Sequence, residues 1–256
     1  MAAVVAVTLA LLGAGYVIVG RTGGQTVADS KARSASALTG LAPKAAAAPD
    51  ADPTPAHENL PSSIPGLGPK TRAEIPAASR QVLVASGKAK NSSESLVTLW
   101  SRTSDGHWHA GAAWPAHNAL HGWTRTHHAG DLHSPIGVFA LSDAGGFDAN
   151  PGTKLPYHHS SKFQAGGVGF EGEPLDDAFD YVIAINYNRV AGTSPLDGTQ
   201  PLGPSRGGGI WVHVDHGGPT HGCVSVSAAH MVDLLHTLLP AAHPVIVMGD
   251  SASLAA

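Results

Sequence analysis

The chain has few charged residues and only one cysteine. Charged side chains make up 13% of its 256 residues, and the formal net charge is −4 with histidine neutral. It contains no long basic run and no alternation of basic and aromatic residues, which argues against a nucleic acid partner. The single cysteine, Cys223, excludes a disulfide bond within the chain.

Glycine, proline and histidine are abundant instead. The 31 glycines and 19 prolines favour short strands joined by many turns over a bundle of helices. The 16 histidines are spread along the chain, so no single histidine indicates a site by its presence alone. We therefore expect a mainly β domain whose functional residues must be found from their spacing.

The N-terminal part has a different composition from the rest. Residues 1–20 carry no charged side chain and are almost wholly apolar, and we predict that residues 1–21 form an export signal or a membrane anchor. Residues 22–78 are rich in alanine, proline and serine, which predicts a disordered linker, although "SSIPGLGPKTRAEIP" (62–76) is also compatible with an irregular start of the domain. We expect an exported, extracytoplasmic protein that contacts a membrane only through its N-terminal segment.

Short apolar runs bounded by turn residues predict a domain over residues 79–250. One helix is expected after Cys223, with Ser227 as its N-cap and apolar residues at helical spacing up to Leu238. The expected fold is a mainly β, mixed β-sandwich with one C-terminal helix. Its strands are predicted at 81–86, 95–102, 107–114, 135–141, 180–187, 209–214 and 244–249.

The stretch "HVDHGGPTHGCV" (213–224) has the residue types of a nucleophilic site. His213 stands near the end of a predicted strand, and residues 214–219 lead back to Thr220-His221-Gly222-Cys223. An imidazole can remove the proton of a nearby thiol, and the thiolate can then attack an acyl carbon. Gly222 allows the backbone to come close to a substrate, and the amides around Gly222 and Cys223 could face the developing oxyanion.

The longer segment "GGGIWVHVDHGGPTHGCVSVS" (207–227) resembles the active-site motif of the L,D-transpeptidases, the YkuD-like enzymes of bacterial cell walls. Three upstream segments support the resemblance: "GDLHSPIGVFAL" (130–141), "NPGTKLPY" (150–157) and "YVIAINYN" (181–188). The spacer between His213 and Thr220 is shorter than is usual in that family. The resemblance covers residues 80–250 and implies the fold stated above.

The resemblance also implies roles for individual residues. Cys223 matches the nucleophile, His213 the histidine that activates it, and His221 the second histidine beside it. The backbone amides of Gly222 and Cys223 match the oxyanion site. The implied reaction releases D-Ala from a peptidoglycan stem and forms a 3-3 cross-link, without a metal or an organic cofactor, and carbapenem-type inhibitors are expected to acylate the same thiol.

Three further residues are predicted to contact the stem peptide. Tyr157 lies in the segment that resembles the family's substrate loop. Ser225 stands where the family often has arginine or asparagine, and Arg206 is a candidate for the missing carboxylate contact.

Two other functions remain open at this point. The first is a zinc-dependent cell-wall hydrolase, because histidine, aspartate and cysteine all bind zinc. Its candidate ligands are His213, Asp215, His216, His221 and Cys223. The second is a wall-binding protein without catalytic activity, for which the thiol would have no purpose.

Some neighbouring residues are expected to have structural roles. Trp211 is predicted to point to the opposite face of its strand from His213, into the core. Asp131 and Asp215 could orient a histidine, although turn and surface roles are commoner for aspartate. We predict that His127, His128, His158 and His159 are solvent-facing loop residues.

Overall fold

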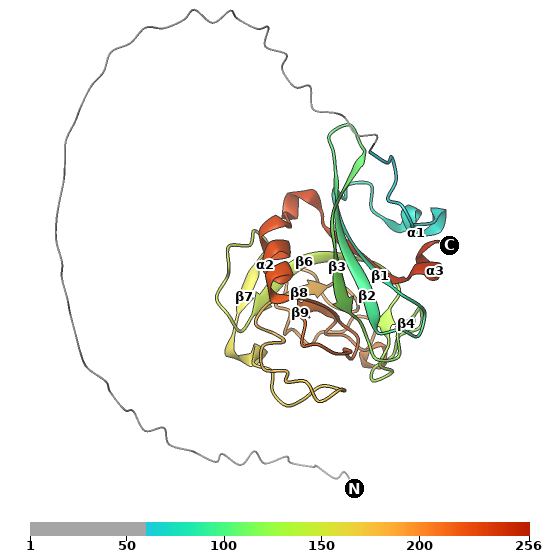
Figure 1. Ribbon diagram of the computed structural model, residues 1–256. Coiled ribbons are helices and arrows are strands. Elements are labelled where there is room, and N and C mark those ends of the chain that lie inside the picture. The colour runs from blue at the N-terminus through green and yellow to red at the C-terminus, as the bar shows by residue number, and fades with distance from the viewer. Residues whose placement is uncertain (1–59) are drawn as a thin grey trace, which may run out of the picture. The chain divides into compact units, whose positions relative to one another are not determined.

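The computed structural model describes residues 60–256 (Figure 1). The predicted segment 1–21 and most of the predicted linker lie outside the described residues. The strands are β1 Gln81–Gly87, β2 Glu94–Arg102, β3 Trp108–His117, β4 Trp123–Thr124, β5 Ser134–Pro135, β6 Gly137–Gly146, β7 Tyr157–His159, β8 Val182–Ile185, β9 Trp211–Val214, β10 Val224–Val226 and β11 Val245–Asp250. The helices are α1 Pro69–Glu74, α2 Ala228–Thr237 and α3 Ser251–Leu254, with the 3-10 turns η1 Ser161–Phe163, η2 Pro204–Arg206 and η3 Pro240–Ala242.

Nine of these strands form one sheet in the order β11-β1-β2-β3-β10-β9-β8-β6-β7. β11 pairs with β1 in parallel and with β6 in antiparallel, so the sheet closes on itself. The short strands β4 and β5 form a separate pair. The prediction of a mainly β fold is confirmed. The expected sandwich is a single closed sheet, because the last strand joins its two sides.

The helix expected after Cys223 is α2, and its sequence explains its bounds. The Ser227 hydroxyl accepts the backbone N–H of His230 at the N-cap, and Leu238 ends the helix two residues before Pro240. Met231, Leu234 and Leu235 are fully buried in the main core. The helix is therefore held by its apolar face, at the end of the strand that follows Cys223.

The predicted linker extends too far into the domain. Residues 60–78 are folded: α1 lies within them, and Ile64 and Leu67 are buried in a second core cluster. The domain also continues beyond the predicted end at residue 250, since α3 buries Leu254 in the same cluster. Gly68 N–H donates to Leu254 O at 2.8 Å, and Figure 1 shows α1 beside α3. Buried apolar side chains and backbone hydrogen bonds therefore tie this proline-rich stretch to the domain.

Within residues 60–256, no helix has both the length and the apolar character needed to span a membrane.

Candidate active site

A cavity of about 290 Å³ opens beside the end of β9. Both His213 and Cys223 lie in its wall, together with Trp211 and His221. Most of the remaining wall is apolar and comes from residues 165–179, among them Leu175, Ala178 and Phe179. No lysine or arginine lines this cavity in the part of the chain that the structure describes.

The pairing of β9 with β10 brings the cysteine and the histidine to this cavity. The two strands run in parallel, with Val224 opposite Val212 and Ser225 opposite His213. Parallel neighbours usually need a connection of a dozen residues or more, whereas residues 215–223 connect these two strands directly. The short spacer therefore does not separate Cys223 from His213, because it joins adjacent strands.

The prediction for Trp211 is wrong. Residues two apart on a strand share a face, so Trp211 points to the same side as His213. Phe179 packs edge-on against both rings, at 5.1 Å from Trp211 and 5.3 Å from His213 between ring centroids. Trp211 is thus part of the cavity wall and holds the ring of His213 through Phe179.

The Cys223 thiol is half-buried and neutral. Its sulfur accepts the backbone N–H of Trp211 at 3.4 Å, and its S–H donates to Gly209 O at 3.7 Å. Burial raises the pKa of the Cys223 thiol to about 11, although the Trp211 N–H acts in the opposite direction. At neutral pH the sulfur therefore keeps its proton, which points to the glycine loop.

The His213 ring is neutral as well, with its proton on the side away from the cavity. It is 2% exposed, and Nδ1 lies 2.8 Å from Val214 O. A carbonyl oxygen only accepts, so Nδ1 carries the proton and Nε2 is left with a free lone pair. Burial lowers the pKa of His213 to about 4. The described residues show no direct hydrogen bond between His213 and Cys223, but both side chains face the same cavity.

The turn before the nucleophile is held by the Thr220 side chain. Its hydroxyl donates to Cys223 O at 2.7 Å and accepts the N–H of Gly222 at 3.3 Å. Gly222 is buried, and a Cβ atom there would lie 2.9 Å from Ile210 Cδ1. Among the described residues, no acceptor takes the backbone N–H of Cys223. That N–H is therefore available to an oxyanion, whereas the N–H of Gly222 is already shared with Thr220.

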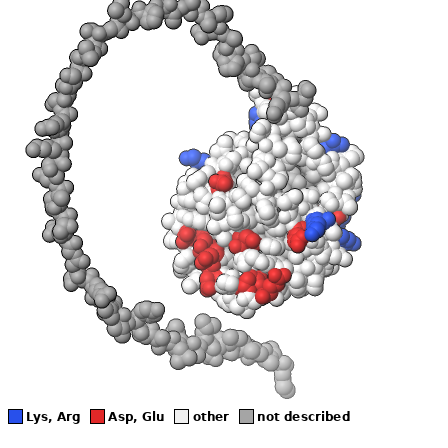
Figure 2. Space-filling view, in the orientation of Figure 1, with Lys and Arg blue, Asp and Glu red and all other residues white. Residues whose placement is uncertain are grey.

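Residues 165–179 cover the cavity through two contacts with the catalytic loop. The Glu173 carboxylate lies 3.2 Å from His216 Nδ1, and His216 stacks on His213 with ring centroids 5.7 Å apart. Phe170 lies against His221, at 4.6 Å between ring centroids. The same part of the chain is acidic, since residues 163–188 contain five carboxylates and no lysine or arginine. Figure 2 shows a group of carboxylates on the lower left of the visible face with no lysine or arginine beside it, whereas at the right edge acidic and basic side chains touch.

A second polar cluster lies one strand away from His213. The Asp215 carboxylate accepts the Ser225 hydroxyl at 2.7 Å and lies 2.8 Å from His117 Nδ1. The hydrogen bond to Asp215 raises the pKa of His117, and His117 and Ser225 together outweigh burial and lower the pKa of Asp215. His117 and Asp215 line a larger cavity of about 590 Å³, and neither Cys223 nor His213 lines it.

The structure separates the predicted substrate contacts from the thiol. Ser225 is fully buried with its hydroxyl on Asp215, and it does not line the cavity of Cys223. Tyr157, on β7, donates its hydroxyl to Asp148 O at 2.8 Å, and burial raises the pKa of its phenol. Arg206, in η2, accepts the Tyr187 hydroxyl on its carbonyl at 2.9 Å. None of the three lies in that cavity wall, so their substrate contacts stay predictions.

The prediction that His127 faces solvent is wrong. His127 is 4% exposed and lies behind the Gly222–Cys223 turn, with Nδ1 2.9 Å from an Asp131 oxygen. Asp131 is likewise mostly buried, at 17% side-chain exposure. The sequence pointed to Asp131 as a residue that could orient a histidine, but it did not identify His127 as the partner.

Several candidate zinc ligands have other partners. Asp215 binds His117 and Ser225, and His216 faces Glu173. Within residues 60–256, no three histidine, cysteine, aspartate or glutamate side chains are grouped so that they could hold a metal ion.

A thiol and an uncharged imidazole that share one cavity are typical of enzymes that transfer acyl groups through cysteine. Comparison with known families gives the same class. The model of the YkuD family, the L,D-transpeptidase catalytic domain, matches residues 83–247, and the chain belongs to this family. No curated protein and no solved structure matches the chain.

Proposed function

We propose that this protein is a peptidoglycan L,D-transpeptidase that forms 3-3 cross-links with Cys223 as its nucleophile. Membership of the family supports the reaction class and the stem peptide as substrate. The observation that carries the proposal for the residues is the shared cavity of Cys223 and His213, in which the imidazole has a free Nε2 lone pair. Peptidoglycan lies outside the cytoplasmic membrane, so the proposal includes export by the N-terminal segment.

Acylation begins from a neutral pair. The Cys223 proton moves to His213 Nε2 as the sulfur attacks the carbonyl carbon of the third residue of the stem tetrapeptide. Burial lowers the pKa of His213 to about 4 and raises that of Cys223 to about 11, which favours proton transfer during the attack over a charged pair formed before it. The new S–C bond forms, the negative oxygen accepts the Cys223 N–H, and the C–N bond breaks as His213 returns the proton to departing D-Ala.

Transfer to the second stem reverses these steps. The side-chain amine of a diamino acid on a neighbouring stem, or a residue attached to it, attacks the thioester carbon. His213 takes the proton from the attacking nitrogen and gives it to the departing Cys223 sulfur. The enzyme is regenerated, and the two stems are joined by an amide bond.

The test uses the full chain, incubated with disaccharide tetrapeptide and, separately, with a carbapenem. Intact-protein mass spectrometry should show one acyl adduct on the wild type and none on Cys223→Ala, with and without EDTA. Chromatography of the stem products should show dimers and released D-Ala. His213→Ala should slow acylation far more than His221→Ala, because His221 is exposed and its ring lies tilted against Phe170.

The outcomes separate the alternatives. Release of D-Ala by Cys223→Ala would contradict the choice of nucleophile. Activity lost with EDTA and restored with zinc would favour the metal-dependent hydrolase. A folded wild type that binds stems without forming any adduct would favour the wall-binding protein. Monomeric products without dimers would mean that water, and not an amine, accepts the acyl group.

A further inference from the structure

His127 occupies the space between two loops that meet at the thiol. A Cβ atom on Gly222 would lie 3.8 Å from His127 Cε1, so the ring edge packs under the turn before Cys223. A Cβ atom on Gly207 would lie 2.9 Å from His127 Nε2. Gly207 begins the glycine run that ends at Gly209, whose carbonyl accepts the thiol proton. One buried ring thus occupies the space beside both backbone segments that surround Cys223, where a side chain at either glycine would meet it.

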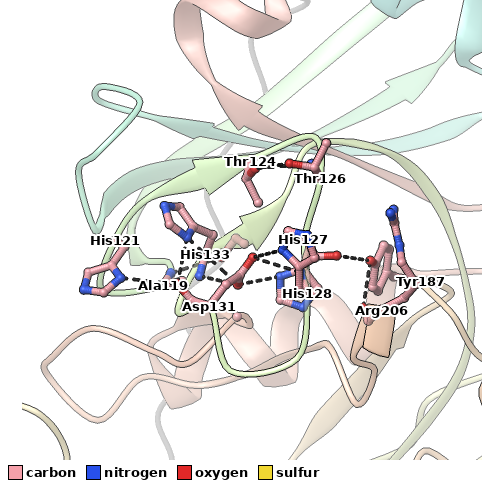
Figure 3. A network of polar contacts seen from close by, with 12 residues as sticks. Ala119, His121, Thr124, Thr126, His127, His128, Asp131, His133, Tyr187 and Arg206 are labelled. Carbon is pink, nitrogen blue, oxygen red and sulfur yellow. Dashed lines mark hydrogen bonds and ion pairs between the residues drawn. The ribbon is translucent and has the colours of Figure 1, made fainter. Parts of the chain in front are cut away.

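Asp131 fixes the orientation of this ring (Figure 3). Its carboxylate accepts the backbone N–H groups of His128 at 2.9 Å and His133 at 3.0 Å, which leaves it no freedom to turn. One of its oxygens lies 2.9 Å from His127 Nδ1, at an angle that departs from a straight hydrogen bond. A carboxylate held by two backbone groups therefore determines where the imidazole lies.

Tyr187 closes the other side of the ring. The two rings meet edge to face with centroids 5.3 Å apart, and the Tyr187 hydroxyl donates to Arg206 O at 2.9 Å. Burial lowers the pKa of His127, while Asp131 and the carbonyl of His133 act in the opposite direction. The His127 ring is consequently uncharged and enclosed by Asp131, Tyr187 and the two glycines, which restrict its movement.

We propose that His127, held by Asp131, is a positioning residue that fixes the backbone N–H of Cys223 for the oxyanion of acyl transfer. The proposal rests on the acyl transfer chemistry proposed above and adds residues that touch neither the substrate nor the thiol. The Gly222–Cys223 turn is held by the hydroxyl of the buried Thr220, and the buried ring of His127 lies next to Gly222. Loss of the ring leaves a gap under Gly222, so that the N–H of Cys223 loses its fixed direction.

Two reactions of the same sulfur separate positioning from general damage. Acylation by p-nitrophenyl acetate forms an S–C bond, breaks the ester C–O bond and releases p-nitrophenolate, with the thiol proton taken by His213. Its transition state carries an oxyanion and therefore needs the N–H of Cys223. Alkylation by iodoacetamide displaces iodide at a saturated carbon and forms no oxyanion. A positioning residue for the oxyanion affects the first reaction only.

The experiment compares both rate constants in the full chain for the wild type, His127→Asn and Asp131→Asn. His128→Asn is the matched control, because His128 is exposed and its ring lies near the same carboxylate, 3.6 Å away. We expect His127→Asn to lower acylation about 10- to 100-fold, less than removal of an oxyanion donor. Alkylation should stay within about two-fold, since the thiol keeps its own contacts. Asp131→Asn should give a smaller loss of the same kind.

Equal losses in both reactions, or no loss of acylation by either variant, would overturn the proposal. Circular dichroism and thermal denaturation of each variant confirm that it is folded. If Asp131→Asn fails to fold, the ratio of the two rate constants in His127→Asn still decides. The ester requires no stem peptide, so a wild type that reacts with the ester but not with stems contradicts the proposed function and leaves this comparison valid.

Discussion

His213 and His117 lie on strands that flank β10, and both are paired with Ser225. Their pKa values nevertheless shift in opposite directions. His213 is 2% exposed, its Nδ1 faces an uncharged carbonyl, and its pKa falls to about 4. His117 is half-buried beside the Asp215 carboxylate, which raises its pKa. Position in the sheet is nearly the same, so burial and the charge of the partner decide which histidine can act as a base.

The comparison also shows where the negative charge of Asp215 acts. The carboxylate is shared between His117 and Ser225, and its effect on the His213 pKa is smaller than the effect of burial. A general base must be uncharged to accept a proton. The Asp215 carboxylate is therefore hydrogen-bonded to His117 and Ser225 and not to His213. Burial keeps His213 neutral.

The largest expected effect comes from exchanging the two histidines separately for glutamine. His213→Gln should slow acylation by a carbapenem about 10²- to 10⁴-fold, because it removes the only base proposed for the thiol. His117→Gln should change the same rate constant by less than about three-fold, since His117 lies outside the cavity. Stopped-flow fluorescence or time-resolved mass spectrometry measures both. Similar losses in the two variants would mean that the base function extends to Asp215 and His117.

The pH dependence of the thiol gives the second effect. A thiol whose pKa is raised to about 11 should react with iodoacetamide at rates that rise steadily through alkaline pH. No separate plateau is expected between about pH 4 and 9, where a thiolate–imidazolium pair would react. This differs from the early alkylation at mildly acidic pH that an activated cysteine would show. A plateau in that range would mean that the pair is charged before substrate binds.

The smallest effect is on the free energy of unfolding. The contributions of His117 and His213 to it should depend on pH in opposite directions. The raised pKa of His117 gives stability below its unfolded value near 6.5, which is lost as pH rises through the folded value. The lowered pKa of Asp215 gives stability above its unfolded value near 3.8, which is lost on acidification. Asp215→Asn should thus cost about 1 to 2 kcal/mol near pH 5.5 and less at pH 9.

The contribution of His213 to stability changes with pH in the opposite direction to that of His117. Its pKa is lowered to about 4, so its stabilising effect is present above pH 6.5 and is lost as pH falls towards 4. Thermal denaturation of the wild type, Asp215→Asn and His213→Gln at pH 4.5, 5.5 and 9 tests both slopes. If Asp215→Asn lowered the free energy of unfolding equally at pH 5.5 and pH 9, Asp215 would not raise the pKa of His117.

Local sequence was sufficient for the strands of four residues or more and for the motif around Cys223, but not for the short strands β4, β5, β7 and β10. The apolar runs 81–86, 95–102 and 244–249 fall on β1, β2 and β11, and the helix after Ser227 begins at the predicted residue. The family resemblance placed His213 and Cys223 together, and the structure brings both to one cavity. Patterns of this kind depend on neighbours within a few residues, which is why they can be read directly.

The residues that surround the site depend on pairings across long stretches of chain. His117 and Asp215 are 98 residues apart, and only the placement of β3 and β9 on either side of β10 joins them. The burial of His127 depends on Gly207 and Gly222, whose lack of a side chain leaves room for its ring. Nothing in the sequence around these glycines indicates that His127 lies next to them. The side of the strand on which Trp211 lies is a different kind of miss. Strand alternation alone predicts that Trp211 and His213 share a face, and the prediction applied that rule wrongly.

The closure of the sheet by β11 has a consequence for how the chain folds. β11 is the last strand in the sequence, yet it lies between β1 and β6, two strands made much earlier. Such non-local pairing is slow to form, and it leaves β1 and β6 unpaired on one side until the final residues are available. A chain cut before Val245 would present two open sheet edges at once, and exposed edges promote association between chains. The C-terminal strand therefore covers two sheet edges that would otherwise be open to pairing with another chain.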